Sequence, residues 1–160
     1  MNETNSEVKE LNMEAKVTVR NLAGWDVSFT RMFDNPGTDV LIPAKGQHRM
    51  SRNEIQVQVD RGNKLFCGTD GSGSHATIYI DDADTRIHVG FETEDTPQAI
   101  FTHAMVKDLF KLTQKQFETA LPEKIRTRAE KFALMEAIKA LNLNDYRKIM
   151  FCVEYTGYQL

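Results

Sequence analysis

The sequence lacks the features that define several large classes of protein. Its 160 residues contain only two cysteines, Cys67 and Cys152, too few for a disulfide framework or a cysteine-rich metal site. No apolar run approaches the roughly 20 residues that a membrane-spanning helix needs, so no membrane is expected among its partners. The first residues are acidic and polar, whereas a secretory signal starts with basic residues and an apolar stretch. We therefore expect a globular protein that is not exported, with both thiols buried and reduced.

Motifs of catalysis are missing as well. No Gly-x-Ser-x-Gly segment supplies the nucleophile of an acyl-transfer triad. The histidines include no pair at the spacing of four residues that places two imidazoles on one helical face; they are His48, His75, His88 and His103. A hairpin would bring His75 opposite His88, but a catalytic zinc site needs a third ligand, and none is expected there. Cys67 and His75 could be read as a nucleophilic thiol and its base, but no sequence pattern indicates that the two side chains meet. We expect no enzymatic activity, no cofactor and no metal.

Two polar segments attract attention but have simpler explanations. Residues 68–74, rich in glycine, lack the Gly-Lys-Ser/Thr ending of a phosphate-binding loop and precede an expected strand instead of a helix. Their alternating side-chain oxygens resemble an EF-hand, but His75 stands where that loop needs glycine. The second segment is a cluster of three acidic side chains whose oxygen atoms could bind a divalent cation: Asp81, Asp82 and Asp84. Because glycine and aspartate are common turn residues, both segments are predicted to be hairpin loops.

Residues 16–101 are predicted to be β-rich. Apolar residues alternate with polar ones from Val17 to Val19 and from Trp25 to Phe29, the period of half-buried strands. Turns are expected at residues 23–24 and 34–37. Further strands are expected over residues 40–43, 64–67, 75–80 and 87–91. About six short strands predict a small antiparallel β-sandwich or barrel.

One short helix is expected within this β-rich part. Ser51 and Glu54 have the spacing of a capping box, and Gly62 is suited to end a helix over residues 52–61. Residues 55–59 also alternate as a strand would. The helix is favoured because both of its ends carry matching signals.

Residues 102–160 are predicted to form about four helices, because the apolar period changes to 3.6 after Pro97. Thr102 can cap the first helix, and residues 113–116 form a capping box for the second. Pro122 is expected to open a long third helix that reaches Leu141. Asn144 and Gly157 are expected to begin and end the last. The fold class is therefore α+β, with a C-terminal helical bundle.

The N-terminal segment and the charge distribution complete the organisation. Residues 1–15 have few apolar anchors and are predicted to be an arm attached to a single domain. Residues 1–101 carry 10 Lys and Arg against 16 Asp and Glu, a net charge of −6, whereas residues 102–160 carry 10 against 7, a net charge of +3. Such a field can orient docking onto a partner or onto another copy of the chain, but charges on solvated helix faces are the favoured explanation.

Two sets of side chains are candidates for binding. Aromatic residues near turns or the C-terminus are typical anchors of protein interfaces, although they can equally cap the core; they are Trp25, Phe29, Phe33, Tyr155 and Tyr158. A basic set on the long helix is the alternative, for nucleic acid: Lys124, Arg126, Arg128 and Lys131. Glutamates interleave this second set and dilute it, so nucleic acid is not the favoured partner.

Scattered positions along the chain also follow the pattern of a known class of protein: a Val-x-Val-x-Asn-Leu strand at the front and a helical module that closes on Thr-Gly. The matching residues are Val17, Val19, Asn21, Leu22, Ile42, Pro43, Arg49, Glu54, Gly62, Asn63, Lys148, Thr156 and Gly157. In these positions the chain resembles small tailed-bacteriophage proteins, and it departs from them in its long glycine-rich segment. The resemblance implies a virion or assembly component, such as a capsid auxiliary or connector-associated protein, in the virion or host cytoplasm. Its partners would be other virion proteins or copies of itself; the alternative is a phage regulatory or counter-defence protein that binds a host protein or nucleic acid.

Overall fold

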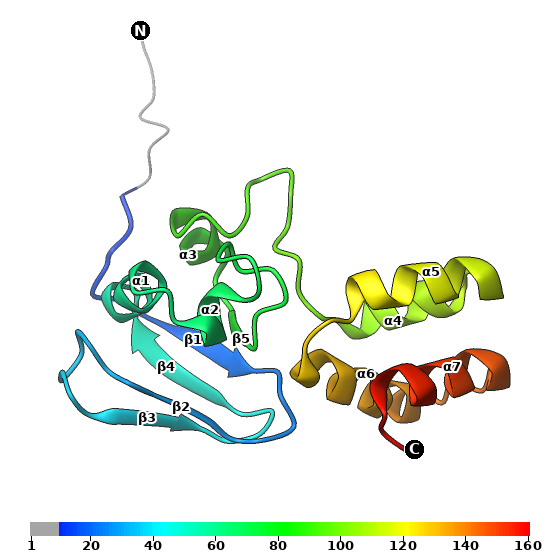
Figure 1. Cartoon of the computed structure of the whole chain (residues 1–160). Coiled ribbons are helices and arrows are strands. Elements are labelled where there is room, and N and C mark those ends of the chain that lie inside the picture. Colours follow the sequence, from blue (N-terminus) through cyan, green and yellow to red (C-terminus); the bar gives the residue numbers. More distant parts are fainter. Residues whose placement is uncertain (1–9) are drawn as a thin grey trace, which may run out of the picture.

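The structure is a computed structural model that describes residues 10–160, so most of the predicted N-terminal arm lies outside the described residues. Within that range the chain forms five strands and seven helices, which confirms the mixed α+β class (Figure 1). The strands are β1 Lys16–Asn21, β2 Val27–Thr30, β3 Asp39–Ile42, β4 Gln47–Ser51 and β5 Ile78–Ile80. The helices are α1 Arg52–Asp60, α2 Lys64–Cys67, α3 Ala83–His88, α4 His103–Phe110, α5 Gln114–Lys124, α6 Arg128–Ala140 and α7 Tyr146–Thr156.

The strands form two small antiparallel sheets. One has the order β4-β1-β5, and Val19 of β1 lies opposite His48 on one side and Ile80 on the other. The second sheet is the β2-β3 hairpin, in which Phe29 lies opposite Val40. Because the strands of residues 10–160 divide between two sheets, they do not close into the barrel that was one of the predicted forms.

Asn21, the last residue of β1, ties the two sheets together. Its side chain is buried, and its Nδ2 donates hydrogen bonds to the carbonyl oxygens of Trp25, Ile42 and Pro43 at 2.8, 3.1 and 3.1 Å. Its Oδ1 accepts from the backbone N–H of Ala23. A buried amide with four partners satisfies its polar atoms and fixes how the chain leaves one sheet for the other.

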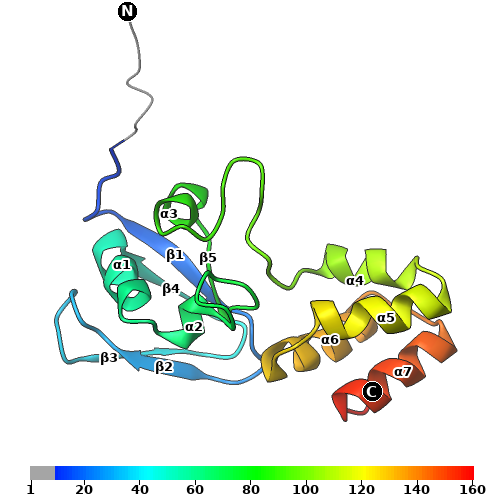
Figure 2. The ribbon, with the colours of Figure 1, turned by 45° about the horizontal axis from the view of Figure 1, so that its top comes forward.

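The buried apolar residues fall into two clusters. The first fills the space between the sheets, α1 and α2, where Phe66 meets Phe29 edge to face; it contains Val17, Val19, Val27, Val40, Ile42, Met50, Ile55, Phe66, Cys67, Ile78, Ile80 and Phe91. The second lies among α4–α7 and contains Val106, Leu109, Phe117, Leu121, Ile125, Leu134, Met135, Ala137, Ile138 and Cys152. Figures 1 and 2 agree that α4–α7 lie side by side at one end of the elongated molecule.

Both cysteines are buried, as expected, one in each cluster. Burial raises the pKa of the Cys152 thiol to about 12, so it packs as a neutral apolar group. None of the helices in residues 10–160 combines the length and apolar character of a membrane span.

Four predictions for the β-rich part are wrong, namely two strands and two hairpin loops. Residues 64–67 form α2, because the Asn63 side chain accepts the Leu65 N–H and caps a helical turn. Residues 83–88 form α3 where a hairpin loop and a strand were expected, because Asp82 caps the N–H of Thr85. The predicted strand over 87–91 therefore does not form, nor does either predicted hairpin loop, and β4 was missed. In each short helix a polar cap resembled a turn signal.

The helical part follows the prediction more closely. Thr102 and Thr113 cap α4 and α5, with a complete capping box at the second, and Gly157 ends α7 in the left-handed conformation. Pro122, however, lies inside α5 and does not start a helix. A second capping box, Thr127 with Glu130, begins α6, and Asp145, not the predicted Asn144, caps α7.

Candidate interaction sites

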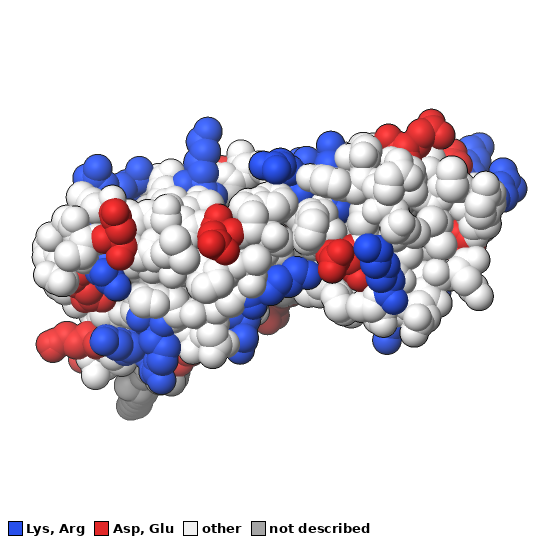
Figure 3. All heavy atoms as spheres, turned by 90° about the horizontal axis from the view of Figure 1, so that it is seen from below, with Lys and Arg blue, Asp and Glu red and all other residues white. Residues whose placement is uncertain are grey.

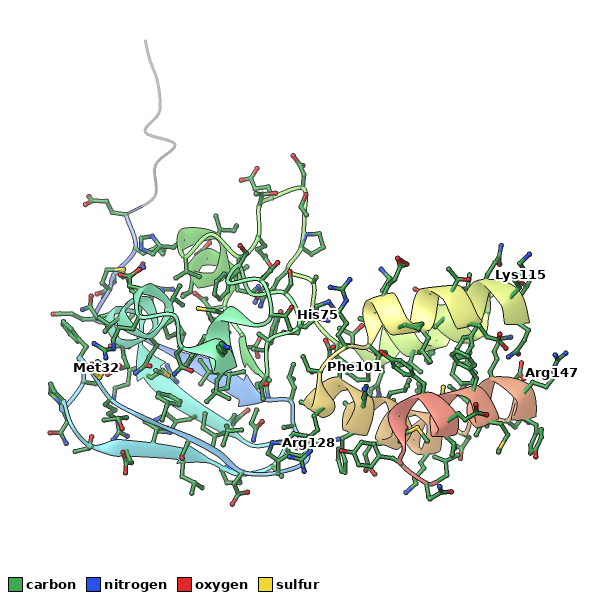
Figure 4. The ribbon with its side chains drawn as sticks, in the orientation of Figure 1. Met32, His75, Phe101, Lys115, Arg128 and Arg147 are labelled. Carbon is green, nitrogen blue, oxygen red and sulfur yellow. The ribbon has the colours of Figure 1, made fainter. Side chains whose placement is uncertain are left out.

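The loop between β2 and β3, residues 31–38, exposes two large apolar side chains and is called the hairpin tip below. Met32 is 37% exposed and Phe33 is 50% exposed. Asn35 and Gly37 adopt positive φ values of 52° and 87°, as the predicted turn requires. Figure 4 shows Met32 at the end of the molecule remote from α4–α7. The hairpin tip is therefore an apolar projection on an otherwise polar loop.

A fully buried carboxylate holds the backbone of the hairpin tip. Glu54 of α1 is 0% exposed and accepts the N–H groups of Met32, Phe33 and Asp34 at 2.9, 2.9 and 2.7 Å. Its Oε2 also accepts from Gln58 Nε2 at 2.9 Å, and the same Nε2 donates to the carbonyl of Thr30. Three consecutive backbone donors on one carboxylate fix the conformation of the projecting residues.

The environment of Glu54 sets its ionisation. Burial alone would raise its pKa, but the hydrogen bonds from Met32, Phe33, Gln58 and Asp34 outweigh it, so the pKa lies below its ordinary value. The carboxylate is therefore ionised at neutral pH, the form that accepts all four bonds.

The capping box predicted for α1 is only half formed. Ser51 Oγ accepts the Glu54 N–H at 3.1 Å, as expected. The reciprocal bond is missing because Asp34 takes the Ser51 backbone N–H at 3.1 Å and also accepts from its hydroxyl. The Glu54 side chain therefore does not accept the N–H of the capping residue, as the third residue of a capping box usually does, and binds the hairpin tip instead.

A second group of side chains joins the β-rich part to the helices and is called the junction: Trp25, His75, Arg128, Glu130 and Phe132. The guanidinium carbon of Arg128 lies 4.5 Å from the centre of the Trp25 ring, and Phe132 meets the same ring edge to face at 5.8 Å. A Cβ at Gly24 would lie 1.8 Å from the Phe132 ring, so only glycine allows this approach. The junction depends on aromatic packing at close range.

A contact between a carboxylate and an imidazole also belongs to the junction. Glu130 is 4% exposed, and its Oε2 lies 2.7 Å from His75 Nδ1. Its Oε1 accepts the backbone N–H groups of Arg126 and Thr127, the two residues that precede α6. Figure 4 places His75 and Arg128 where the two parts meet. His75 therefore faces Glu130, and the predicted pairing of His75 with His88 across a hairpin is wrong, because that hairpin does not exist.

The remaining predicted aromatic anchors make contacts within the molecule. Phe29 packs on Phe66 in the first cluster. Tyr155 donates its hydroxyl to the carbonyl of Ile125 at 2.7 Å, and Tyr158 meets Phe132 edge to face. Among the five predicted anchors, Phe33 has the largest exposure, and the role of all five as anchors stays a prediction.

The four predicted basic side chains differ in whether they contact an aromatic ring. Arg128 covers Trp25, and Lys131 Nζ lies 4.9 Å from the centre of the Tyr155 ring. Lys124 and Arg126 are exposed, and Arg126 Nε donates to the carbonyl of Glu123. Figure 3 shows Lys and Arg side chains gathered at the waist between the two parts. Lys124, Arg126 and Arg128 are therefore exposed to solvent, although Arg128 also covers Trp25, and Lys131 is partly buried.

A cleft of about 650 Å³ opens between the β-rich part and α4–α5. One wall is apolar and is made by Ile100, Met105, Leu109, Leu112 and Ala120. The opposite wall carries Arg86, which pairs with Glu92 at 2.7 Å and lies over the ring of Tyr79. Lys124 also lines this cleft. Its volume is typical of a site that buries a few side chains or a small ligand.

The acidic and glycine-rich segments are occupied by internal bonds. Asp81 pairs with Arg20 at 2.8 Å, and Asp82 pairs with Arg52 at 3.1 Å while capping α3. Asp70 accepts the N–H groups of Ser72 and Ser74 within the loop. In residues 10–160, no group of three or more His, Cys, Asp or Glu side chains is placed to hold a metal ion.

Comparisons with known proteins give no family assignment. The chain matches no protein-family model, no curated protein and no solved structure. The similarity to tailed-phage proteins therefore remains a prediction from sequence.

Proposed function

We propose that the chain is a non-enzymatic structural or assembly protein that binds protein partners through its hairpin tip. The observation that supports this role best is the pairing of two exposed apolar side chains with a buried carboxylate beneath them. Phenylalanine and methionine are enriched in the cores of protein interfaces. A tip that exposes them while its backbone is held in place has the composition of a binding anchor.

The fixed backbone matters because association loses conformational freedom. Ordering a flexible loop on binding costs free energy that subtracts from affinity. The bonds from Met32, Phe33 and Asp34 to Glu54 order the hairpin tip before any partner arrives. More of the burial energy of Phe33 is then available for binding.

The nature of the partner is also part of the proposal. From the resemblance alone, we propose a capsid auxiliary or connector-associated role, with other virion proteins or copies of the chain as partners in the virion or host cytoplasm. In this proposal the two small sheets form a sandwich that presents the hairpin tip. Helices α4–α7 form a bundle that offers a second surface.

Photo-crosslinking from the hairpin tip tests the proposed function. The crosslinking amino acid p-benzoylphenylalanine is placed at Phe33 and, as a matched control, at Ile87, which is 41% exposed on α3. Irradiation in the native host should join Phe33, but not Ile87, to a defined polypeptide, which mass spectrometry identifies. Equal or absent adducts at the two positions would contradict the proposal.

The exposed basic groups that make no contact with an aromatic ring of the junction, Lys124 and Arg126, support a second candidate, a regulatory or counter-defence protein that binds nucleic acid or a host protein. Lys124 and Arg126 lie together near the end of α5 and face solvent. Phosphate binding by such groups weakens steeply with salt. The double variant Lys124→Glu, Arg126→Glu should abolish salt-sensitive binding to a single-stranded or duplex oligonucleotide, whereas the control Lys139→Glu should not. Absence of oligonucleotide binding by the unaltered chain at low salt would remove the nucleic-acid form of this candidate.

A further inference from the structure

We infer that the waist between the β-rich part and α4–α7 binds single-stranded nucleic acid, whose phosphates meet Lys45, Arg128 and Lys131. These three cations are called the basic row below. The inference goes beyond the proposed assembly role and does not depend on the hairpin tip. The basic row also differs from the surface of the second candidate, which consists of Lys124 and Arg126.

Two cations of the basic row lie over aromatic rings that touch each other. Lys45 Nζ is 6.0 Å from the centre of the Phe132 ring, and Arg128 covers Trp25 at 4.5 Å. Because Phe132 meets Trp25 edge to face, both cations belong to one continuous patch. Arg128 is exposed, so its guanidinium can receive a base on the side away from Trp25. Unpaired bases stack on guanidinium planes and aromatic rings.

The cations of the basic row have no anionic partner in the part of the chain that the structure describes. Among residues 10–160, their side chains form no ion pair and no hydrogen bond. Glu130 adjoins Lys131 in the sequence but is buried, and Asp26 adjoins Trp25 but accepts the Ala44 N–H. These cations are therefore available to phosphates, which bind by neutralising such charges.

A hollow of about 210 Å³ continues the basic row toward β1 and the start of α4. Its titratable lining consists of Arg20, Lys45 and His103, and none of the lining residues within 10–160 is a carboxylate. Arg20 already pairs with Asp81, so Lys45 supplies the unpaired charge there. A hollow with this lining is suited to a phosphate group.

The backbone at Lys45 distinguishes this lysine from the others. Its φ is 59°, a left-handed conformation that glycine and asparagine adopt more readily than lysine. The Lys45 N–H donates to the carbonyl of Ala23 at 3.1 Å, and the Gly46 N–H donates to that of Pro43 at 2.8 Å, so the turn is held in place. Unfavourable backbone conformations of this kind cluster at functional sites.

A single strand fits the basic row better than a duplex or an acidic protein does. Figure 3 shows Lys and Arg side chains at the narrow waist of the molecule. The faces of unpaired bases can stack on Arg128, whereas a duplex hides those faces and an acidic peptide has none. A charged groove combined with stacking planes is the usual arrangement for single-strand binding.

Neutralising two lysines of the basic row tests the inference. Lys45→Asn, Lys131→Gln removes two cations, and asparagine suits the left-handed turn at position 45. Lys107→Gln, Lys111→Gln removes the same charge at exposed positions of α4 and is the matched control. Circular dichroism and thermal unfolding establish that each variant is folded. The probe is a labelled oligonucleotide of about 15 deoxythymidines, followed by fluorescence anisotropy between about 50 and 200 mM salt.

The unaltered chain and the control should bind the oligonucleotide with the salt dependence of three phosphate contacts. For a single strand, the logarithm of the association constant then falls with the logarithm of salt concentration at a slope of about −2. The basic-row variant should bind at least about tenfold more weakly, with a slope of about −0.7. Trp25 is the single tryptophan, so its emission should change on binding as a base stacks on Arg128.

Any of four outcomes would overturn the inference. The first is that the unaltered chain does not bind at about 50 mM salt. The second is equal weakening in the control, which would assign the effect to net charge. In the third, poly-glutamate displaces the oligonucleotide at equal charge concentration, which would favour an acidic protein as the partner.

The fourth outcome is loss of binding in Lys124→Glu, Arg126→Glu while Lys45→Asn, Lys131→Gln binds normally. That result would support the second candidate, with its phosphates on α5, and remove the basic row as the site. The proposed assembly role is tested separately, because the crosslinks from Phe33 do not involve the basic row.

Discussion

Glu54 and Glu130 occupy the same position, the third residue of their helices, and both are buried, yet they bind different parts of the chain. Glu130 completes its capping box and adds a contact to His75. Glu54 does not complete its capping box, because Asp34 accepts the Ser51 N–H instead. The Glu54 side chain binds the hairpin tip. The comparison teaches that a helix-capping pattern places a carboxylate reliably, while residues distant in sequence decide what that carboxylate binds.

The two carboxylates stabilise different features. Glu130 joins the start of α6 to the β-rich part, so it helps to hold the β-rich part and the helical part together. Glu54 bears on the shape of an exposed loop and hence on the proposed binding surface. Removing each in turn therefore separates overall stability from the presentation of the hairpin tip.

The largest effect is expected for Glu54→Ala. It leaves buried donors without an acceptor, so the free energy of unfolding should fall by about 3 kcal/mol in urea titrations. Gln56→Ala, on the same helix with a side chain that donates to Asp60, is the control and should change stability by about 0.5 kcal/mol or less. Equal stability of Glu54→Ala and the unaltered chain would show that the carboxylate does not hold the loop.

A smaller loss, of about 2 kcal/mol, is expected for Glu130→Ala, because two backbone donors and His75 lose their acceptor. A double-mutant cycle with His75→Ala should give a coupling energy of about 1 kcal/mol. Strict additivity of the two substitutions would mean that the contact between Glu130 and His75 does not join the parts.

The third prediction concerns pH. The pKa of Glu54 is lower in the folded chain than its ordinary value of 4.5, so its stabilising contribution is present above that value and is lost as pH falls through the folded-state pKa. The difference in unfolding free energy between the unaltered chain and Glu54→Gln should be constant above about pH 5.5 and shrink below about pH 4.5. Comparison with Glu54→Gln cancels the contributions of other carboxyls, such as Asp82 and Glu92, whose pKa values are also lowered. A difference that grows on acidification would reverse the assigned sign.

The smallest effect is expected for Arg128→Ala, about 0.5–1 kcal/mol, because it removes one cation–π contact and leaves Phe132 against Trp25. Trp25 is the single tryptophan, so its fluorescence reports on the junction directly. Emission should shift to longer wavelength as the ring gains water. Arg126→Ala, which touches no aromatic ring of the junction, should leave the emission unchanged.

Local patterns explain what the sequence could predict. The alternation in β1 and the caps at Thr102, Thr113 and Gly157 depend on residues within one turn or strand, so α4, most of α5 and the end of α7 were predicted correctly. Helices α2 and α3 were missed because four to six residues show no helical period, and their caps, Asn63 and Asp82, also occur in turns.

The candidate sites were less predictable, because they depend on contacts between distant residues. Phe33 was among the predicted anchors, but nothing local distinguishes it from Trp25, whose ring is covered by residues more than 100 positions later. The role of Glu54 follows from competition between Asp34 and Glu54 for the Ser51 N–H, and that competition exists only after the hairpin folds onto α1. Met32 and the cleft gave no signal in the sequence.

Amide hydrogen exchange at Met32, Phe33 and Asp34, followed by NMR, tests the central claim most directly. If the Glu54 carboxylate holds the hairpin tip, these three amides exchange slowly in the unaltered chain and much faster in Glu54→Ala, while amides of β1 keep their protection. Exchange at the rate of an unstructured peptide in the unaltered chain would contradict the claim.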